Sequence, residues 1–275
     1  MELRQKEENL RRILKGMGKV LIAYSGGADS TFLLKIAHEE LDGGVLAITA
    51  KSESLPKKGL REAKQIAKEM GVRHEIIQTD EVRREEYAKN PINRCYFCKK
   101  EVYGELRKIA DREGIPHILD GFQMSDVGDF RPGRKAAREW GVRSPLKEAG
   151  LTKEEIRFLS RKMGLPTWDN PSSPCLSSRI PYGSRITKEK LSQIEKAEDF
   201  LHSLGFREVR VRHHGEMARI EVPKEKFERL FEKNLREKVV SKLIEFGFSF
   251  VTLDLRGYRQ GSLNENFKKT RDIKF

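Results

Sequence analysis

The sequence has 275 residues, enough for one large domain or two modest ones with a self-supporting core. It is 37% hydrophobic and 35% charged, and no apolar run approaches the roughly 20 residues that a membrane-spanning helix needs. The composition therefore argues against a membrane protein. Because the first residues lack the apolar core of a secretory signal, we expect a cytoplasmic location.

The net charge of +13 allows a polyanionic partner such as tRNA. Basic residues alternate with acidic ones almost everywhere, however, which favours solvated helix faces over one basic patch. A nucleotide substrate would also suit a positive potential. Nucleic acid therefore stays an alternative partner, and a small phosphorylated molecule is the favoured one.

The first part of the chain alternates predicted strands and helices, which predicts a parallel sheet covered by helices, an α/β fold. Short apolar runs predict the strands, and spacing by three and four residues predicts the helices. The expected elements are, in order, a helix over 3–15, a strand over 19–24, a helix over 31–41, a strand over 45–50, a helix over 57–70, a strand over 74–78, a helix over 97–113 and a strand over 117–120.

A proline-rich segment separates this part from a smaller one. Capping-box spacing from Thr152 to Glu155 predicts a helix that ends near residue 163. Residues 164–183 contain four prolines, cannot form a regular helix, and predict a linker or a functional loop. The expected elements that follow are a helix over 188–204, strands near 207–212 and 217–222, helices within 224–246 and a strand over 248–255.

The changed pattern predicts a smaller α+β domain at the C-terminus. We expect an ATP-binding domain over 1–165, a cysteine-bearing active-site loop over 166–186, and an α+β domain over 187–275 that binds substrate or mediates oligomerisation.

The turn between the first strand and the next helix has the composition of an anion site. Gly26 and Gly27 permit a phosphate to approach the backbone, and Ser25 and Ser30 add hydroxyl donors at a helix N-terminus. Asp29 would repel a phosphate, so we expect it to cap the helix or to help hold Mg²⁺. The turn lacks the Lys-Ser/Thr pair of a Walker A loop.

The hexapeptide over 25–30 resembles the PP-loop of the adenine-nucleotide α-hydrolase superfamily, whose fold is a Rossmann-like parallel sheet. The resemblance implies cleavage of ATP between the α- and β-phosphates, with Mg²⁺, and adenylation of an acceptor oxygen. We also expect Gly121, which follows the strand over 117–120, to bind the nucleotide.

The three cysteines leave several interpretations open. Cys95 and Cys98 form a CxxC, and Cys175 lies alone in the proline-rich loop. Structural zinc would need a fourth ligand, and the adjacent His213 and His214, expected in a turn, would face opposite ways on a strand. The alternatives are a redox dithiol, buried inert thiols, three ligands of a 4Fe–4S cluster, or Cys175 as a nucleophile.

Several motifs together resemble the LarE family, the ATP-dependent sulfur transferases of nickel-pincer cofactor biosynthesis. The resemblance covers roughly residues 5–266 and is most specific around Cys175. The motifs that carry it occur at 25–30, 94–99, 170–183 and 257–265.

The resemblance implies adenylation of a carboxylate of pyridinium-3,5-biscarboxylic acid mononucleotide, followed by replacement of its oxygen with sulfur. In some members the cysteine that matches Cys175 gives up its own sulfur. Members with the additional CxxC carry a 4Fe–4S cluster instead, and Cys95 and Cys98 place this chain with them. Sulfide or another sulfur donor is then a partner. We expect Lys99 to take part in catalysis by lowering the pKa of a reactive thiol.

The resemblance also assigns charged residues of the smaller domain. Arg210, Arg212 and Arg259 would bind the substrate phosphate, for which the arginine fork is suited. Glu198 and Glu221 match acidic positions near the sulfur site, although they could equally be surface glutamates. The family further implies a homo-oligomer, with a hexamer as one expectation.

Three other functions remain open at this point. A PP-loop tRNA thiolase also pairs this loop with three cysteines, and the basic charge suits RNA. An amidating PP-loop enzyme would leave the cysteines without a role. An ATP-binding module without catalysis would release no pyrophosphate.

Overall fold

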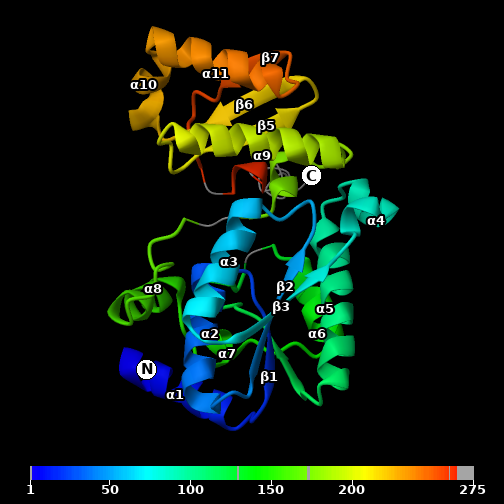
Figure 1. Cartoon of the computed structure of the whole chain (residues 1–275), viewed down its shortest axis with the longest axis vertical. Helices are drawn as coiled ribbons and strands as arrows, with labels where there is room; N and C mark the ends of the chain where they lie inside the picture. The colour runs from blue at the N-terminus through cyan, green and yellow to red at the C-terminus, as the bar shows by residue number, and fades with distance from the viewer. Residues whose placement is uncertain (1, 129, 172–173, 260, 265–275) are drawn as a thin grey trace, which may run out of the picture. The chain divides into compact units, whose positions relative to one another are not determined.

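The computed structural model of the chain describes residues 2–128, 130–171, 174–259 and 261–264. The chain folds into two compact units (Figure 1). Unit 1 comprises Met1–Tyr87 and Ile92–Ser173, and unit 2 comprises Ala88–Pro91 and Pro174–Phe275. Among the described residues, no helix is both long enough and apolar enough to cross a membrane.

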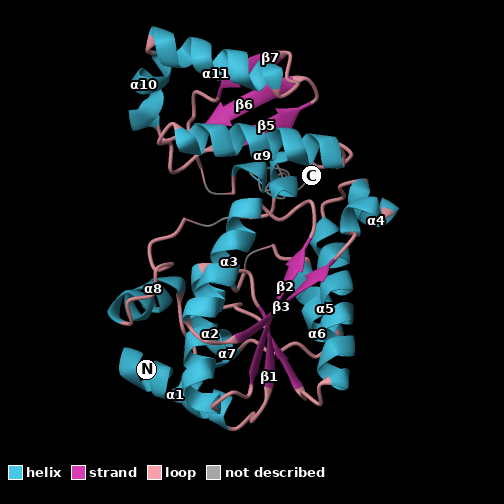
Figure 2. Ribbon diagram, viewed as in Figure 1, coloured by secondary structure: helices cyan, strands magenta, loops and turns pink. Residues whose placement is uncertain are grey.

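Strands and helices alternate through most of unit 1 (Figure 2). Its elements are α1 Leu3–Lys15, β1 Val20–Ala23, α2 Ala28–Leu41, β2 Val45–Lys51, α3 Lys57–Glu69, β3 Arg73–Gln78, η1 Glu81–Arg83, α4 Glu85–Ala88, α5 Arg94–Arg112, β4 His117–Leu119, η2 Met124–Asp126, α6 Gly133–Glu139, α7 Pro145–Glu148 and α8 Lys153–Lys162.

The four strands of unit 1 form one parallel sheet in the order β3-β2-β1-β4. Successive residues of β1 point to opposite faces, so Val20 and Ile22 pack with α1, α2, α3, α7 and α8, whereas Leu21 packs with α5 and α6. Figure 1 shows α2 and α3 on one side of the sheet and α5 on the other. β2 lies on one side of β1 and β4 on the other, so the strand order reverses direction between β1 and β4. The carboxyl ends of two strands at such a topological switch point are where α/β folds bind ligands.

Unit 2 is a three-stranded sheet packed with helices. In the order β5-β6-β7, β5 and β6 are antiparallel and β6 and β7 are parallel. Its core includes Leu201 of α9, Val211 of β5 and Leu243 of α11. The elements are η3 Leu176–Arg179, α9 Lys188–Ser203, β5 Arg210–His214, β6 Met217–Glu221, η4 Lys224–Lys226, α10 Phe227–Phe231, α11 Lys233–Glu245, β7 Phe250–Leu253 and η5 Ser262–Asn264.

Residues 88–91 belong to unit 2, although the residues before and after them in the sequence belong to unit 1. The Asn90 side chain is fully buried, and its Nδ2 donates to the carbonyl oxygens of Ile180, Pro181 and Ser184 at 3.2, 2.7 and 3.0 Å. The carbonyl oxygen of Asn90 accepts from the N–H of Gly183 at 3.0 Å. These bonds fix the segment that follows Cys175.

Most predicted elements are present, and the exceptions bear on function. The helix expected from residue 31 begins at Ala28, so half of the predicted phosphate loop is its first turn. The helix expected from residue 97 begins at Arg94 and includes both cysteines of the CxxC. His213 and His214 end β5 and do not form the expected turn. The short helices α4, α6 and α7 were not predicted from the sequence.

The capping box at the start of α8 gives a stability prediction. Thr152 Oγ1 accepts from the Glu155 N–H at 3.3 Å, and Glu155 Oε2 accepts from the Thr152 N–H at 2.8 Å. Thr152→Ala removes one acceptor and is expected to lower the free energy of unfolding by about 1 kcal/mol. Urea unfolding would measure the change. Thr152→Ser, which keeps the hydroxyl, is the matched control, and an equal loss in both variants would contradict the role of the cap.

Candidate active site

The turn between β1 and α2 has the groups of a phosphate site. The Ser25 and Ser30 hydroxyl oxygens lie 3.0 Å apart, and Ser30 Oγ also donates to the Gly27 carbonyl at 3.1 Å. Gly27 is the N-cap of α2 and makes no side-chain cap, so the first-turn N–H groups stay available to a ligand. Together with the positive end of the helix dipole, these donors suit a bound anion.

Two glycines let the backbone segments around this turn approach each other. Gly26 has φ +74°, and a Cβ at this position would lie 2.8 Å from Cβ of Ala63 on α3. A Cβ at Gly121 would lie 3.0 Å from the backbone nitrogen of Ser30. The structure therefore brings Gly121 to the predicted phosphate loop, although 90 residues separate it from Ser30.

Asp29 does not cap α2, which corrects one of its two predicted roles. It is the second residue of the helix, and its Oδ1 is buried without a hydrogen-bond partner among the described residues. Burial raises the pKa of Asp29 above its ordinary value, and Asp126 adds to this, whereas Lys153 opposes it. A buried carboxylate oxygen without a partner suits a cation ligand, which is the other predicted role.

The CxxC lies on the first turn of α5. Cys95 is exposed and Cys98 is partly buried, and because they are three residues apart on one helix they share a side of it. Lys99 Nζ lies 5.4 Å from the centroid of the Tyr103 ring. Tyr103 raises the pKa of Lys99, and Cys98 adds to this, although burial lowers it. Lys99 therefore stays a cation beside the cysteine pair.

The carboxylate of Asp120, directly after β4, accepts hydrogen bonds from four groups, and Asp120 was not predicted as a site residue. Its Oδ2 accepts from Arg134 Nη1 at 2.6 Å and from the Tyr103 hydroxyl at 3.2 Å. Its Oδ1 accepts from the Ser144 hydroxyl at 2.6 Å and from the Phe122 N–H at 3.2 Å. The carboxylate thus ties the cysteine helix to the segment that contains Gly121. A polar residue at the carboxyl end of a parallel strand was the available signal.

In unit 2, Cys175 stands at the start of a short 3-10 turn, η3, and is partly buried. Arg179, at the end of this turn, is 1% exposed and donates to the carbonyl oxygens of Pro174 at 2.7 Å and Cys175 at 3.2 Å. Its Nε and Nη2 donate to the two carboxylate oxygens of Glu198, each at 2.9 Å. Glu198 is therefore buried beside the cysteine turn and is not one of the surface glutamates considered above.

Glu198 gives a pH prediction. Burial alone would raise its pKa, but the charge and hydrogen bonds of Arg179 outweigh burial and hold the pKa below its ordinary value. A carboxyl with a lowered folded-state pKa stabilises the fold above its unfolded pKa of about 4.3, and this stability is lost as pH falls through the folded-state pKa. Glu198→Gln should remove this part of the acid sensitivity. Thermal unfolding of both proteins from pH 7 to pH 3 would measure the change. If the melting temperatures of wild type and variant fall in parallel with pH, the prediction is contradicted.

A cavity of about 530 Å³ in unit 2 is strongly basic. Tyr182 and His214 also line it, and Asp254 is the only acidic residue among the described residues of its wall. Its arginines are Arg179, Arg212, Arg219, Arg256 and Arg259. The nitrogens of Arg179 are bonded to the cysteine turn and to Glu198, and the other four guanidinium groups favour a ligand with several negative charges. Of the five, only Arg212 and Arg259 were predicted from the sequence as phosphate ligands.

Arg212 links this cavity to the cysteine turn. Its Nη2 donates to Glu221 at 2.9 Å and to the Ser262 hydroxyl at 2.7 Å, and its Nη1 donates to the Ser178 carbonyl at 2.8 Å. The Nε of Arg212 is buried and has no hydrogen-bond partner among the described residues. Glu221 is fully buried and holds Arg212 and Arg219, so it too is not a surface glutamate.

The other two predicted phosphate ligands lie in the same unit. Arg210 is 7% exposed, its guanidinium carbon lies 5.3 Å from the centroid of the Tyr258 ring, and its Nη1 donates to the Val209 carbonyl. Arg259 lies on the cavity wall, with Nη2 3.6 Å from Asp254 Oδ2. Ser172, Ser173, Gln260 and Glu265, which belong to two of the family motifs, lie outside the described residues.

Within the described residues, no group of three or more His, Cys, Asp or Glu side chains is arranged to hold a metal ion. Cys95 and Cys98 belong to unit 1 and Cys175 to unit 2. Two thiols on one side of a helix fit two ligands of a cluster.

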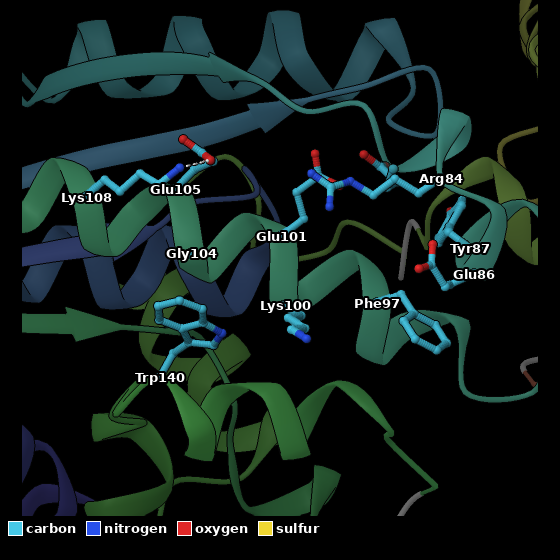
Figure 3. Close-up of a pocket in the computed structure, with 11 residues that line it drawn as sticks. Arg84, Glu86, Tyr87, Phe97, Lys100, Glu101, Gly104, Glu105, Lys108 and Trp140 are labelled. Atoms are coloured by element: carbon cyan, nitrogen blue, oxygen red, sulfur yellow. Dashed lines mark hydrogen bonds and ion pairs between the residues drawn. The ribbon is translucent and has the colours of Figure 1, made fainter.

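A second hollow, of about 320 Å³, lies in unit 1 along α5 (Figure 3). Figure 3 shows Trp140 beside Gly104, on the opposite side of the pocket from Arg84. Four glutamates and three basic side chains line it, and none of the predicted site residues is among its lining residues. This mixture of charges favours no one class of ligand.

Comparisons with known proteins agree with this geometry. The family model described as queuosine biosynthesis protein QueC matches residues 19–89, which include the phosphate loop. An uncharacterized protein of Synechocystis is 45% identical over 97% of this chain and 100% of its own length. The tRNA-specific 2-thiouridylase MnmA of Rickettsia africae is 24% identical over 68% of this chain and 61% of its own length.

The relative that identifies the family is the pyridinium-3,5-bisthiocarboxylic acid mononucleotide synthase of Lactiplantibacillus plantarum. It is 37% identical over 98% of this chain and 97% of its own length. The predicted α/β fold of PP-loop type and the predicted resemblance are confirmed. The chain belongs to the LarE family of PP-loop enzymes, the family of this synthase.

Proposed function

We propose that the enzyme adenylates a carboxylate of pyridinium-3,5-biscarboxylic acid mononucleotide and then replaces the activated oxygen with sulfur, in nickel-pincer cofactor biosynthesis. The observation that carries the proposal is the arginine-lined cavity beside the Cys175 turn in unit 2. It suits a small substrate with one phosphate and two carboxylates. The family relative supports the identity of that substrate.

In the first step, a carboxylate oxygen of the substrate attacks the α-phosphorus of ATP. The bond between the α-phosphorus and the bridging oxygen breaks, and pyrophosphate leaves. The hydroxyl groups of Ser25 and Ser30 and the N–H groups of α2 would hold the pyrophosphate part of ATP. The product is an acyl adenylate, whose AMP leaves far more readily than an oxide ion.

In the second step, hydrosulfide attacks the carbonyl carbon of the adenylate and loses its proton to solvent. A C–S bond forms, the C–O bond to AMP breaks, and AMP leaves with the electron pair. Arg210, Arg212 and Arg259 would hold the substrate phosphate, and Lys99 would stabilise negative charge beside the cysteines. Two rounds give the bis-thiocarboxylate.

Mg²⁺ completes the proposed ATP site. The fit rests on Asp29, whose buried Oδ1 has no hydrogen-bond partner among the described residues. A hard cation that keeps several waters is usually bound by one or two carboxylates together with substrate phosphates, so a single carboxylate beside the loop suffices.

We propose Cys95, Cys98 and Cys175 as the ligands of a 4Fe–4S cluster. Cys95 and Cys98 fit as a pair because they share one side of the first turn of α5. Bound there, a cluster with three protein ligands would supply sulfide to the reaction. On the resemblance alone, we also propose a cytoplasmic homo-oligomer, with a hexamer as the expected size.

Anaerobic purification with cluster reconstitution tests this function. The protein is incubated with ATP, Mg²⁺, sulfide and the pyridinium substrate, and mass spectrometry follows the exchange of oxygen for sulfur. Many turnovers support the cluster. If Cys175 loses one sulfur atom and the reaction stops at one equivalent, the cluster is refuted and the transferase stands. If no thiolated product forms in either case, the substrate is wrong.

A tRNA thiolase is the second candidate, favoured by the net charge of +13 and by the relative named tRNA-specific 2-thiouridylase. Filter binding with tRNA at several salt concentrations would separate the two. Submicromolar affinity that falls steeply with salt would favour the thiolase, because phosphate contacts release counterions.

A further inference from the structure

We propose that Arg179 is a positioning residue that fixes the backbone of Cys175, and that Glu198 acts through it. Arg179 is among the largest fully buried side chains of the described residues. Its Nη1 donates to the cysteine turn, namely to the carbonyl oxygens of Pro174 and Cys175 and to the Ser178 hydroxyl at 2.8 Å. The guanidinium therefore holds both ends of the turn.

Glu198 keeps Arg179 in this position. Its carboxylate accepts hydrogen bonds from both the Nε and the Nη2 of Arg179, and its Oε1 also accepts from the Val211 N–H at 2.9 Å. The carboxylate is thus tied to α9, on which it lies, and to the neighbouring strand β5. Truncating one partner of a buried ion pair leaves the other charge uncompensated, so neither residue can be replaced without disturbing the turn.

A second contact holds the same turn from β5. Arg212 Nη1 donates to the Ser178 carbonyl, while the Ser178 N–H donates to the Cys175 carbonyl at 3.0 Å. The backbone of the turn is therefore bonded at residues 174, 175 and 178. With its backbone fixed in this way, the Cα–Cβ bond of Cys175 has one direction, and its Sγ is limited to the few positions that staggered rotamers allow.

These contacts change the role expected of Glu198. Both of its oxygens accept from Arg179, and one accepts from a backbone N–H as well. A carboxylate bound in this way is a poor base, because protonation would break the pair that holds it. Glu198 is accordingly a positioning residue rather than a catalytic residue.

The direct test measures the turn and needs no substrate. In the wild-type protein, the amides of Ser178 and Ile180 should exchange with solvent as slowly as those of β5. In Arg179→Lys and Glu198→Gln, this exchange should accelerate by about tenfold or more. Arg236→Lys, an exposed arginine of α11, is the matched control and should leave it unchanged. Fast exchange in the wild type would overturn the proposal even if both variants failed to fold.

Alkylation of the cysteines gives an independent measurement. At about pH 10, where thiols are ionised and access decides the rate, iodoacetamide should label Cys175 about fivefold faster in the two variants. A chelator first removes any bound iron, so that Cys95 and Cys98, in unit 1, serve as internal controls within the same sample. Equal labelling of Cys175 in wild type and variants would contradict the role of Arg179.

The activity measurement rests on the proposed function. The variants should lower kcat for thiolation, with the KM for ATP unchanged, because the ATP loop lies in unit 1. A lowered rate of pyrophosphate release would show that the damage is general and would contradict a positioning role. If labelling and exchange change as expected but no protein forms thiolated product, the proposed function fails and the role of Arg179 stands.

Discussion

Replacing Cys175 by alanine is expected to lower thiolation by at least about a thousandfold while pyrophosphate release continues. The reason is the separation of the chemistry along the chain. The ATP loop belongs to unit 1, and Cys175 is the only cysteine of unit 2. Activation of the carboxylate should therefore survive the loss of the thiol, and transfer of sulfur should not. Parallel assays of pyrophosphate and thiolated product would measure both steps.

Matched changes at the CxxC determine how Cys175 works. If all three cysteines hold a cluster, Cys95→Ser and Cys98→Ser should lose repeated turnover as completely as Cys175→Ala. If Cys175 gives up its own sulfur, both serine variants should still form one equivalent of product. Thiolation by Cys175→Ala at the wild-type rate would remove Cys175 from the mechanism in either case.

Gly26→Ala is expected to reduce pyrophosphate release by about a hundredfold or more, the second large effect. Gly26 has φ +74°, a conformation that costs an L-residue about 1–2 kcal/mol. The added methyl group would also lie 2.8 Å from Cβ of Ala63, so the loop or α3 must move. Displacing the loop removes the N–H groups and hydroxyls from the positions that phosphate requires.

Gly18→Ala is a matched control for this change. Gly18 has φ +69°, but a Cβ there would meet no atom within 4 Å. It should therefore share the backbone cost, seen as a similar loss of stability in urea, and retain pyrophosphate release. Equal activity losses in both variants would indicate a general loss of stability and would contradict the local clash.

The elements with a clear periodic pattern could be predicted from the sequence. Val20–Ala23 and the first five residues of Val45–Lys51 are buried or nearly so on both faces and therefore form largely apolar runs in the sequence. The starts of α2 and α5 were placed three residues late. Their first turns carry small, charged and cysteine residues, so no apolar period marks them.

Long-range contacts could not be predicted. The local pattern around Glu198 and Glu221 is that of any amphipathic helix or strand, yet tertiary structure buries both against arginines up to 19 residues away. The Asp120 carboxylate likewise accepts hydrogen bonds from Tyr103, Arg134 and Ser144, which lie on separate elements. The family resemblance pointed to Glu198 and Glu221, and only the structure gave their partners.

The segment around Asn90 bears on how the protein can be dissected. Because residues 88–91 belong to unit 2, neither unit is a continuous stretch of sequence, and the backbone passes between them three times. A shortened chain that ends at Ser173 would keep Asn90 but lose the carbonyl oxygens of Ile180, Pro181 and Ser184 that it bonds. In such a fragment the Asn90 side chain, which is fully buried in the whole chain, would lose these three acceptors. Truncation at the boundary after Ser173 would therefore separate residues 88–91 from the unit to which they belong. An exchange of unit 2 with that of a relative would have to include this four-residue segment as well.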